Sequence, residues 1–315
     1  MIKRTDWSPL EPGDVVDVVA PASGAYRQEI KKIQQLLESW GLEPRLDPQI
    51  VDPKAPLMAH SDEERFRQLR QALLASDSKV IWSLRGGYGS LRLLPLLAKM
   101  KRPKRPKLFL GYSDITSLHS FFGQSWGWST WHAPGLESLS QRHVQSRVQK
   151  EIKELLFGLK RQMDFLGLKP MNSKARALKR IQAPVVGGNM AVIQSSLGTP
   201  WALRAQGKIL FFEDIGEKAH RVDRMLTQMS QAGFFSGVRA VLFGGLSLSD
   251  SRGEKLIWKT AIQDFTQANK VAVFRGLEVG HVSVNRPLPL NTPAQLLQMG
   301  KQNFALRLSL KERRS

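Results

Sequence analysis

The interpretation of the first half of the chain depends on the stretch FLGYSDITSLH, residues 109–119. An apolar, strand-like run ends at Gly111 and Tyr112, and Ser113 follows directly, ahead of a segment with helical spacing. A serine at this place is either a helix N-cap or a nucleophile exposed at a sharp strand-to-helix turn. Ile115 excludes the G-x-S-x-G pattern, so the usual hydrolase elbow is absent, and position alone leaves both interpretations open.

Outward from this stretch, strands and helices alternate. Apolar runs predict strands within residues 13–23, 79–85, 107–113 and 128–134. Helical spacing, a Ser cap and early acidic residues predict helices over 26–41 and 61–76, and a third helix over 90–100 is limited or kinked by Pro95. This alternation favours an α/β fold with a doubly wound, mostly parallel sheet.

The second half of the chain is richer in strands. Residues 207–215 and 238–246 predict strands, and residues 218–233 and 253–268 predict helices. Within residues 271–290, a strand ends before His281 and a loop-like, Pro-rich segment follows it. The basic stretch 165–182 has weak periodicity and is interpreted as a connection. We therefore expect an N-terminal domain over residues 1–164, a linker over 165–182 and a C-terminal α+β domain over 183–315.

Composition excludes several kinds of site. The 315 residues include no cysteine, so disulfides, thiolate zinc sites and cysteine nucleophiles are excluded. No metal-ligand spacing appears, and we expect neither a metal nor a cofactor. No apolar run is long enough to span a membrane and the start lacks a signal-peptide pattern, so we expect a cytoplasmic protein.

The charge is strongly positive. It amounts to +20, from 47 basic and 27 acidic residues, and the densest basic run is residues 99–107. This run either binds an anionic polymer or forms a solvated loop; the second interpretation is favoured because no aromatic residues are interleaved for base stacking.

Three loops follow predicted strands of the first half, at the sheet edge where α/β proteins place their sites. They are APAS (20–23), RGGYGS (85–90) and GYSD (111–114). A catalytic serine needs a histidine base, and His132 and His281, each near the end of a strand, are the best placed. His119 is interpreted as packed or capping, and His143 and His220 as solvated. Glu213 and Asp214 end an apolar strand, while Glu217 is better suited to cap the next helix.

Taken together, six segments in order resemble the LD-carboxypeptidase family, a group of serine peptidases that also includes the microcin C self-immunity peptidases. The segments are LEPGDVVDVVAPAS, RGGYGSLRLL, GYSDITSLH, GGN, LFFEDIGEKAHRVDRMLTQM and GHVSVNRPLPL, between about residues 10 and 290. The resemblance implies a Rossmann-like N-terminal domain, a β-rich C-terminal domain and an active site between them. It also implies that Ser113 is the nucleophile, His281 the base and Glu213 its orienting acid. The N–H of Asp114 and one N–H from Gly86 or Gly87 would form the oxyanion hole.

These expectations lead to a function. We expect hydrolysis of the amide between the L-centre of diaminopimelate or lysine and the terminal D-alanine of murein tetrapeptides, in peptidoglycan recycling. Arg85, beside the expected oxyanion hole, is the candidate that binds the terminal carboxylate. We expect a homodimer that acts on a murein peptide and requires neither nucleic acid nor a membrane. The alternatives are a peptidase that cleaves a peptidyl aminoacyl-adenylate antibiotic, and a non-catalytic binder of anionic polymer.

Overall fold

The computed structural model describes residues 8–55, 57–247 and 252–310, which fall into two compact units. Unit 1 holds the described residues up to Arg161, together with Ser283–Pro289 and Leu310. Unit 2 holds the described part of Gln162–Val282 and the segment Leu290–Ser309. The chain thus returns to unit 1 directly after Val282, which no local sequence pattern indicates.

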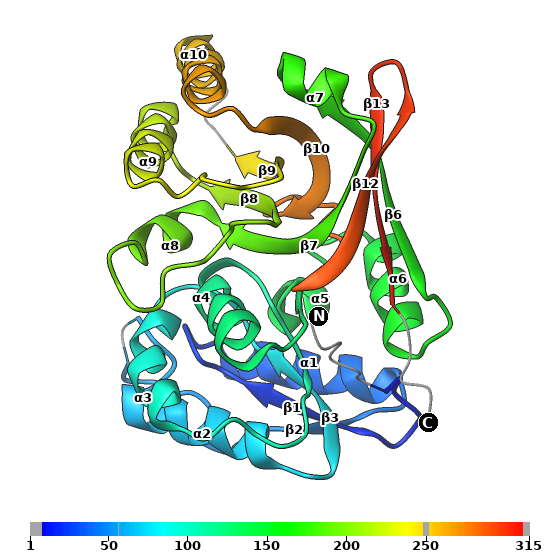
Figure 1. Ribbon diagram of the computed structural model, residues 1–315. Helices are drawn as coiled ribbons and strands as arrows, with labels where there is room; N and C mark the ends of the chain where they lie inside the picture. Colours follow the sequence, from blue (N-terminus) through cyan, green and yellow to red (C-terminus); the bar gives the residue numbers. More distant parts are fainter. Residues whose placement is uncertain (1–7, 56, 248–251, 311–315) are drawn as a thin grey trace. The chain divides into compact units, whose positions relative to one another are not determined.

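Unit 1 is built on a six-stranded sheet with the strand order β11-β5-β4-β3-β1-β2 (Figure 1). Every pairing from β2 to β5 is parallel, which confirms the expected doubly wound sheet. The strands are β1 (Val15–Val19), β2 (Glu43–Arg45), β3 (Ser78–Ser83), β4 (Leu108–Gly111), β5 (Thr130–His132) and β11 (Leu288–Leu290).

The strand order changes direction next to β1. From β1 the chain continues to β2 on one side, while β3, β4 and β5 follow on the other. In an open α/β sheet, ligands bind outside the carboxyl ends of the strands at such a switch point. The loops that follow β1 and β3 are therefore the expected place for a site.

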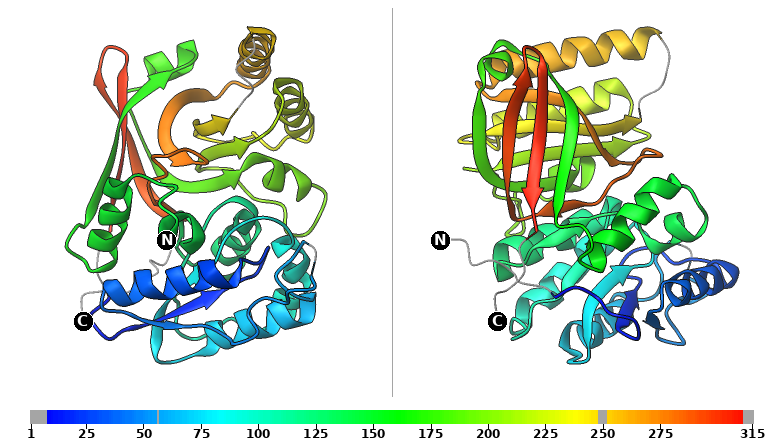
Figure 2. Two further views of the ribbon diagram at one scale, coloured as in Figure 1. Left: turned by 180° about the vertical axis from the view of Figure 1, so that it is seen from behind. Right: turned by 90° about the vertical axis from the view of Figure 1, so that its right-hand side faces the viewer.

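Helices cover both faces of this sheet, and α1 and α2 lie on opposite faces (Figures 1 and 2). The helical segments are α1 (Arg27–Ser39), α2 (Asp62–Leu74), η1 (Ser90–Leu93), α3 (Leu94–Lys99), η2 (Ser113–Ile115), α4 (Thr116–Phe121), η3 (Phe122–Trp126), α5 (Leu136–Ser140) and α6 (Ser146–Leu156). Ser61 caps α2 by accepting a hydrogen bond from Glu64 N at 3.3 Å, as its sequence predicts. Pro95 stands in the first turn of α3, where proline is tolerated.

The basic run over residues 99–107 forms the loop between α3 and β4, and most of its side chains are exposed. Lys107, its last residue, is instead buried and reaches Asp17 Oδ2 at 3.2 Å and Ala72 O at 2.5 Å. Burial lowers the pKa of Lys107, which the charge of Asp17 opposes. Lys107 is therefore part of the buried core of unit 1, although it belongs to the basic run.

Unit 2 is a closed barrel with the order β10-β6-β13-β12-β7-β8-β9. Neighbouring strands from β7 to β10 are parallel, and the pairs that include β6, β12 or β13 are antiparallel. The strands are β6 (Gln162–Pro170), β7 (Arg180–Asn189), β8 (Ile209–Ile215), β9 (Ala240–Ser247), β10 (Ala272–Gly280), β12 (Thr292–Gly300) and β13 (Asn303–Ser309). The expected β-rich second domain is confirmed.

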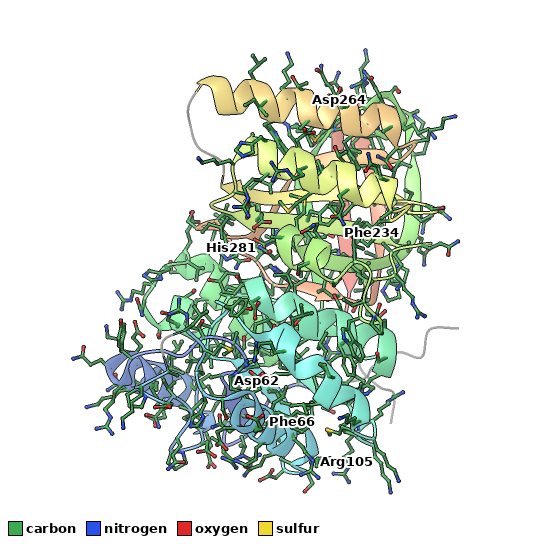
Figure 3. The ribbon with its side chains drawn as sticks, turned by 90° about the vertical axis from the view of Figure 1, so that its left-hand side faces the viewer. Asp62, Phe66, Arg105, Phe234, Asp264 and His281 are labelled. Atoms are coloured by element: carbon green, nitrogen blue, oxygen red, sulfur yellow. The ribbon has the colours of Figure 1, made fainter. Side chains whose placement is uncertain are left out.

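The helices of unit 2 are α7 (Ser173–Ala177), α8 (Met190–Ser195), α9 (Ala219–Gln231) and α10 (Arg252–Ala268). An apolar core lies between α8, α9, α10 and the parallel strands, with Phe212, Phe243 and Phe265 among its buried members. Phe234, labelled in Figure 3, packs against this core. Burial of this apolar surface holds β8, which carries Glu213, in place.

The two units differ from the expected domains: Ser283–Pro289 belongs to unit 1, and the expected linker lies within unit 2. Residues 165–182, interpreted as a connection, include most of β6, all of α7 and the start of β7. Strand β6 pairs with β10 and β13, more than a hundred residues later in the chain. Its partners, rather than its own periodicity, make it a strand, which is why the sequence pattern is weak.

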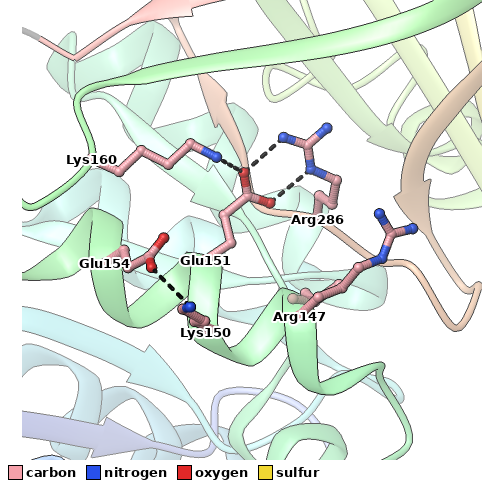
Figure 4. Close-up of a pocket in the computed structure, with 7 residues that line it drawn as sticks. Arg147, Lys150, Glu151, Glu154, Lys160 and Arg286 are labelled. Carbon is pink, nitrogen blue, oxygen red and sulfur yellow. Dashed lines mark hydrogen bonds and ion pairs between the residues drawn. The ribbon is translucent and has the colours of Figure 1, made fainter.

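A buried ion-pair cluster fastens the returning segment of unit 1 to α6. Glu151, 8% exposed, accepts hydrogen bonds from Arg286 Nε and Nη2, both at 2.7 Å, and from Lys160 Nζ at 2.5 Å (Figure 4). Burial on its own would raise the pKa of Glu151, but these hydrogen bonds outweigh it and lower the pKa. The cluster lines a pocket of about 400 Å³.

Removing the Glu151 charge should strongly destabilise the protein. We expect Glu151→Gln to cost about 3–5 kcal/mol, because the largely buried Arg286 guanidinium loses the charge of Glu151 that accepts two of its hydrogen bonds. Since the pKa of Glu151 is lowered in the folded protein, its contribution is present above the unfolded-state pKa and is lost as the pH falls. Urea unfolding at several pH values measures both effects.

The matched control is Glu154→Gln, one turn further along α6. Glu154 approaches Lys150 at 3.9 Å in an exposed pair, which contributes about 0–1 kcal/mol. If both variants lose the same small amount of stability, the buried cluster does not hold the segment.

Candidate active site

Ser113 stands at a sharp turn between β4 and the helices that follow it. Its φ of 63° lies in the left-handed region, which costs a residue with a Cβ about 1–2 kcal/mol. Tyr112 occupies the N-cap of η2 and Ile115 that of α4, and neither helix has a side-chain capping bond. The structure thus gives no support to the capping interpretation, and the strained turn is typical of an exposed nucleophile.

The glycine loop after β3 lies against this serine. A Cβ on Gly86 would lie 2.6 Å from Ser113 Cβ and 3.0 Å from Ser113 Oγ, so only glycine fits. Gly87 has a φ of 106° and lies against the side chain of Ser23. Two features, close backbone approach and left-handed geometry, therefore require glycine here.

The backbone N–H groups of this region suit an oxyanion site. Among the described residues outside helices and strands, the N–H groups of Gly86 and Gly87 donate no backbone hydrogen bond, and Asp114 lies in the short helical turn η2. The Asp114 carboxylate is turned inward, where Oδ2 accepts from Ser90 N at 2.7 Å, and burial raises the pKa of this carboxyl group. Asp114 thus anchors the turn through its side chain.

Arg85 precedes the glycine loop, and one nitrogen of its guanidinium already has partners within the protein. Its Nη1 lies 3.2 Å from Glu137 Oε1 and 3.4 Å from Gly24 O. Burial raises the pKa of Glu137, and the charge of Arg85 opposes that effect. The guanidinium, 38% exposed, retains further N–H groups for a ligand.

Unit 2 brings Glu213 and His281 together. Glu213, fully buried near the end of β8, accepts hydrogen bonds from His281 Nδ1 at 2.6 Å and from His281 N at 3.1 Å, both on Oε2. Burial by itself would lower the pKa of His281. The hydrogen bond and charge of Glu213, with the charge of Asp214, outweigh burial and raise it. A carboxylate that orients a histidine is the arrangement of a catalytic base.

Gly280 makes this pair possible. Its φ is 109°, and a Cβ there would lie 2.6 Å from Glu213 Cβ and 2.8 Å from Glu213 Oε2. Gly245 of β9 pairs with Gly280 and lies against Val282. The end of β10 can therefore approach β8 only because these positions lack side chains.

Asp214 has a separate structural task. Its carboxylate accepts hydrogen bonds at 2.9 Å from Asn189 Nδ2, Ala191 N and Ile215 N, and so holds the start of α8. Burial raises the pKa of Asp214 to about 6. Glu217, expected as a cap, pairs instead with Arg221 at 2.8 Å, and Lys218 occupies the N-cap of α9.

The sequence matches two profiles of one family. Residues 16–133 match the LD-carboxypeptidase N-terminal domain, and residues 182–296 match the LD-carboxypeptidase C-terminal domain. The chain belongs to the LD-carboxypeptidase family. A Rickettsia conorii protein, provisionally named a carboxypeptidase, is 35% identical over 284 residues, which are 90% of this chain and 88% of the relative.

Solved structures agree with this assignment. The muramoyltetrapeptide carboxypeptidase from Oxalobacter formigenes superposes with a TM-score of 0.81 at 25% identity, covering 95% of this chain and 99% of that one. The microcin C7 self-immunity protein MccF of Escherichia coli is 23% identical over 253 residues, 72% of this chain and 74% of the relative. Its wider likeness is one of fold, with a TM-score of 0.78 at 18% identity over 98% of this chain and 99% of that one.

In this member of the LD-carboxypeptidase family, the other histidines fall into distinct environments. His119 is 3% exposed, its Nε2 contacts Gly111 O at 2.9 Å, and burial lowers its pKa to about 3, which confirms the packed interpretation. His132 is fully buried with its ring 6.2 Å from that of Tyr112. His143 and His220 are exposed, as predicted. His281 is thus the candidate base whose ring contacts a carboxylate, that of Glu213.

Two residues with positioning roles were not assigned from the sequence. Ser23 donates from N to Gly86 O and accepts from Tyr88 N on Oγ, both at 3.2 Å, so it holds the glycine loop. Gly280 leaves the space that the Glu213 side chain needs. Both lie in recognisable stretches, APAS and GHVSVN, but their roles depend on contacts with distant segments.

The described residues hold neither a metal-binding cluster nor a membrane-spanning helix. In residues 8–55, 57–247 and 252–310, no group of three or more His, Asp or Glu side chains is arranged to hold a metal ion. Over the same ranges, no helix has both the length and the apolar composition that crossing a membrane would need.

Proposed function

We propose that this protein is a serine-type LD-carboxypeptidase that removes the terminal D-alanine from murein tetrapeptides during cytoplasmic peptidoglycan recycling. The observation that carries the proposal is the 2.6 Å contact between His281 Nδ1 and Glu213 Oε2, which directs the other ring nitrogen to proton transfer. The strained turn at Ser113 and the glycine loop against it supply the remaining groups.

The proposed reaction has two halves. Ser113 Oγ attacks the carbonyl carbon of the scissile amide while His281 Nε2 takes the hydroxyl proton. The N–H of Asp114 and one N–H from Gly86 or Gly87 bind the resulting oxyanion. The C–N bond then breaks, and the amine of D-alanine leaves with the proton from His281. Water attacks the acyl-enzyme with His281 again as base, and the murein tripeptide is released.

Recognition of a carboxy-terminal residue requires donors for its carboxylate. Arg85 and the N–H groups of the glycine loop stand beside Ser113 and are the donors that the proposal assigns. Blocking the carboxylate as an amide removes a charge-assisted contact of about 1.5–3 kcal/mol, equivalent to about one to two decades in kcat/KM. Replacing D-alanine by L-alanine should cost at least as much.

The test is hydrolysis of three tetrapeptides that end in D-alanine acid, D-alanine amide and L-alanine acid. Strong preference for the first supports the carboxypeptidase. Equal rates on all three would contradict it, even if Ser113 proved catalytic. An aminoacyl-adenylate mimic in the same mass-spectrometric panel tests the second candidate, which the fold shared with MccF favours; preferred cleavage of the mimic would reassign the substrate.

Catalysis and stability should respond to pH in opposite directions. His281 acts as a base only when neutral, and its pKa is raised above the usual 6.5. We therefore expect kcat/KM to rise with pH through an apparent pKa above 6.5. A raised pKa also means that the stability contributed by the pair is present at low pH and is lost as the pH rises through the same window. A pH–rate profile beside urea unfolding measures both, and an ascending limb at or below pH 6 would contradict the assignment.

A further inference from the structure

A large pocket in unit 1 occupies the switch point of the sheet. It has a volume of about 1130 Å³ and is lined by Ser23–Arg27 after β1, Leu46–Pro48 after β2 and Arg85 after β3. Ligands of α/β sheets bind at this place. Pockets of roughly 300–1,000 Å³ bind ligands of drug size, so this volume suits a ligand of several residues.

The pocket is continuous with the loop that lies against Ser113. Ser23 forms part of its wall and is tied to Gly86 O and Tyr88 N, both at 3.2 Å. Arg85, the residue before Gly86, lines the pocket as well. A ligand in this pocket therefore extends directly from the proposed oxyanion site.

The charged groups of the wall favour an anion. Of its two acids, Asp47 pairs with Arg67 at 2.6 Å, whereas Asp52 keeps its charge and accepts from the backbone Lys54 N at 2.9 Å. Arg27 and Lys31, one turn apart on α1, are exposed cations that line the same pocket. Neither side chain forms an ion pair or a hydrogen bond with any residue that the structure describes. The unpaired charges of the wall are thus two cations and one acid, which leaves the pocket a net positive charge.

Apolar side chains complete the lining. Ile30, Ile50 and Met58 belong to the wall, and Tyr26 and Leu57 expose 80% and 57% of their surface. Exposed apolar surface beside uncompensated cations suits a ligand that is acidic but carries apolar or sugar faces, rather than a small inorganic anion.

The size of the pocket identifies which part of the substrate enters it. In the proposed reaction the leaving group is a single alanine, which is far too small to fill 1130 Å³. We propose that the pocket binds the acidic acyl part of the murein substrate, the peptide that remains after alanine has left, with or without its sugar. Arg27 and Lys31 bind its carboxylates, and Tyr26 and Leu57 cover its apolar faces. This inference rests on the proposed function.

The experiment compares substrates of different length in a charge-reversed variant. Arg27→Glu/Lys31→Glu should raise KM for the murein tetrapeptide about tenfold, because two partly solvated charge contacts are lost and reversed. The variant should leave kcat unchanged. The dipeptide diaminopimelyl-D-alanine keeps the scissile bond but lacks the acyl extension, so its kcat/KM should change little. Calorimetry with the murein tripeptide, which has no D-alanine to lose, should show the same tenfold weakening.

Lys32→Glu is the matched control, since Lys32 is exposed on the same helix but does not line the pocket. It should behave as wild type with both substrates. An equal loss on tetrapeptide and dipeptide, an equal loss in the control, or an unchanged KM in the double variant would overturn the pocket assignment while the carboxypeptidase stands. Wild-type protein that hydrolyses no murein substrate would overturn the proposed function and this inference with it.

Discussion

Replacing Ser113 by alanine should lower kcat by several orders of magnitude, on the order of 10⁶-fold where serine proteases have been dissected. The side chain removed is the proposed nucleophile, and neither a water molecule nor a neighbouring hydroxyl can replace it in the covalent step. The fold should be preserved, because alanine keeps the Cβ and with it the same left-handed strain at φ 63°. Urea unfolding and binding of the murein tripeptide should therefore match wild type.

Ser120→Ala is the control for this variant, since Ser120 is a half-buried serine in α4, the helix that follows η2. It should retain wild-type turnover. If purified Ser113→Ala protein hydrolyses the tetrapeptide at the wild-type rate, Ser113 is not the nucleophile and the serine mechanism fails.

The first half of the fold could be predicted because its information is local. Apolar runs, caps and helical spacing mark β1, β3, β4, α1 and α2 within a few residues of their observed ends. The parallel order follows from the alternation of strands with helices. In unit 2 the antiparallel strands depend on partners far along the chain, as when β6 pairs with β10 and β13. No local pattern states which distant strand closes the barrel.

The candidate site divides in the same way. Ser113 and the glycine loop could be predicted as site residues because each follows a strand. The structure adds that Gly86 lies directly against Ser113. From the residues alone, the base stayed open between His132 and His281. What separates them is a contact between β8 and the end of β10 that requires Gly280, a close approach that spacing cannot express. The Glu213–His281 contact comes from the fold of unit 2, not from a motif.

The contact between Glu213 and His281 leads to the second prediction of a large loss of activity. Glu213→Gln should lower kcat/KM by about 10⁴-fold, the loss seen when the acid of a serine triad becomes an amide. Glu213 Oε2 accepts both His281 Nδ1–H and His281 N–H, and an amide nitrogen in its place would present a donor to Nδ1 and favour the wrong tautomer. Without the carboxylate, burial is the main influence left on the ring, so the pKa of His281 should fall.

The shift of the pH profile separates this role from a merely structural one. The ascending limb of the residual activity of Glu213→Gln should move to lower pH, in the direction opposite to the wild-type shift. Asp214→Asn is the matched control, because Asp214 bonds to Asn189, Ala191 N and Ile215 N and only adds to the charge near His281. The Asp214→Asn variant should be less stable, because the start of α8 loses its carboxylate acceptor. The ascending limb of its pH–rate profile should move little. A Glu213→Gln enzyme that keeps both its rate and its ascending limb would show that Glu213 does not orient the base.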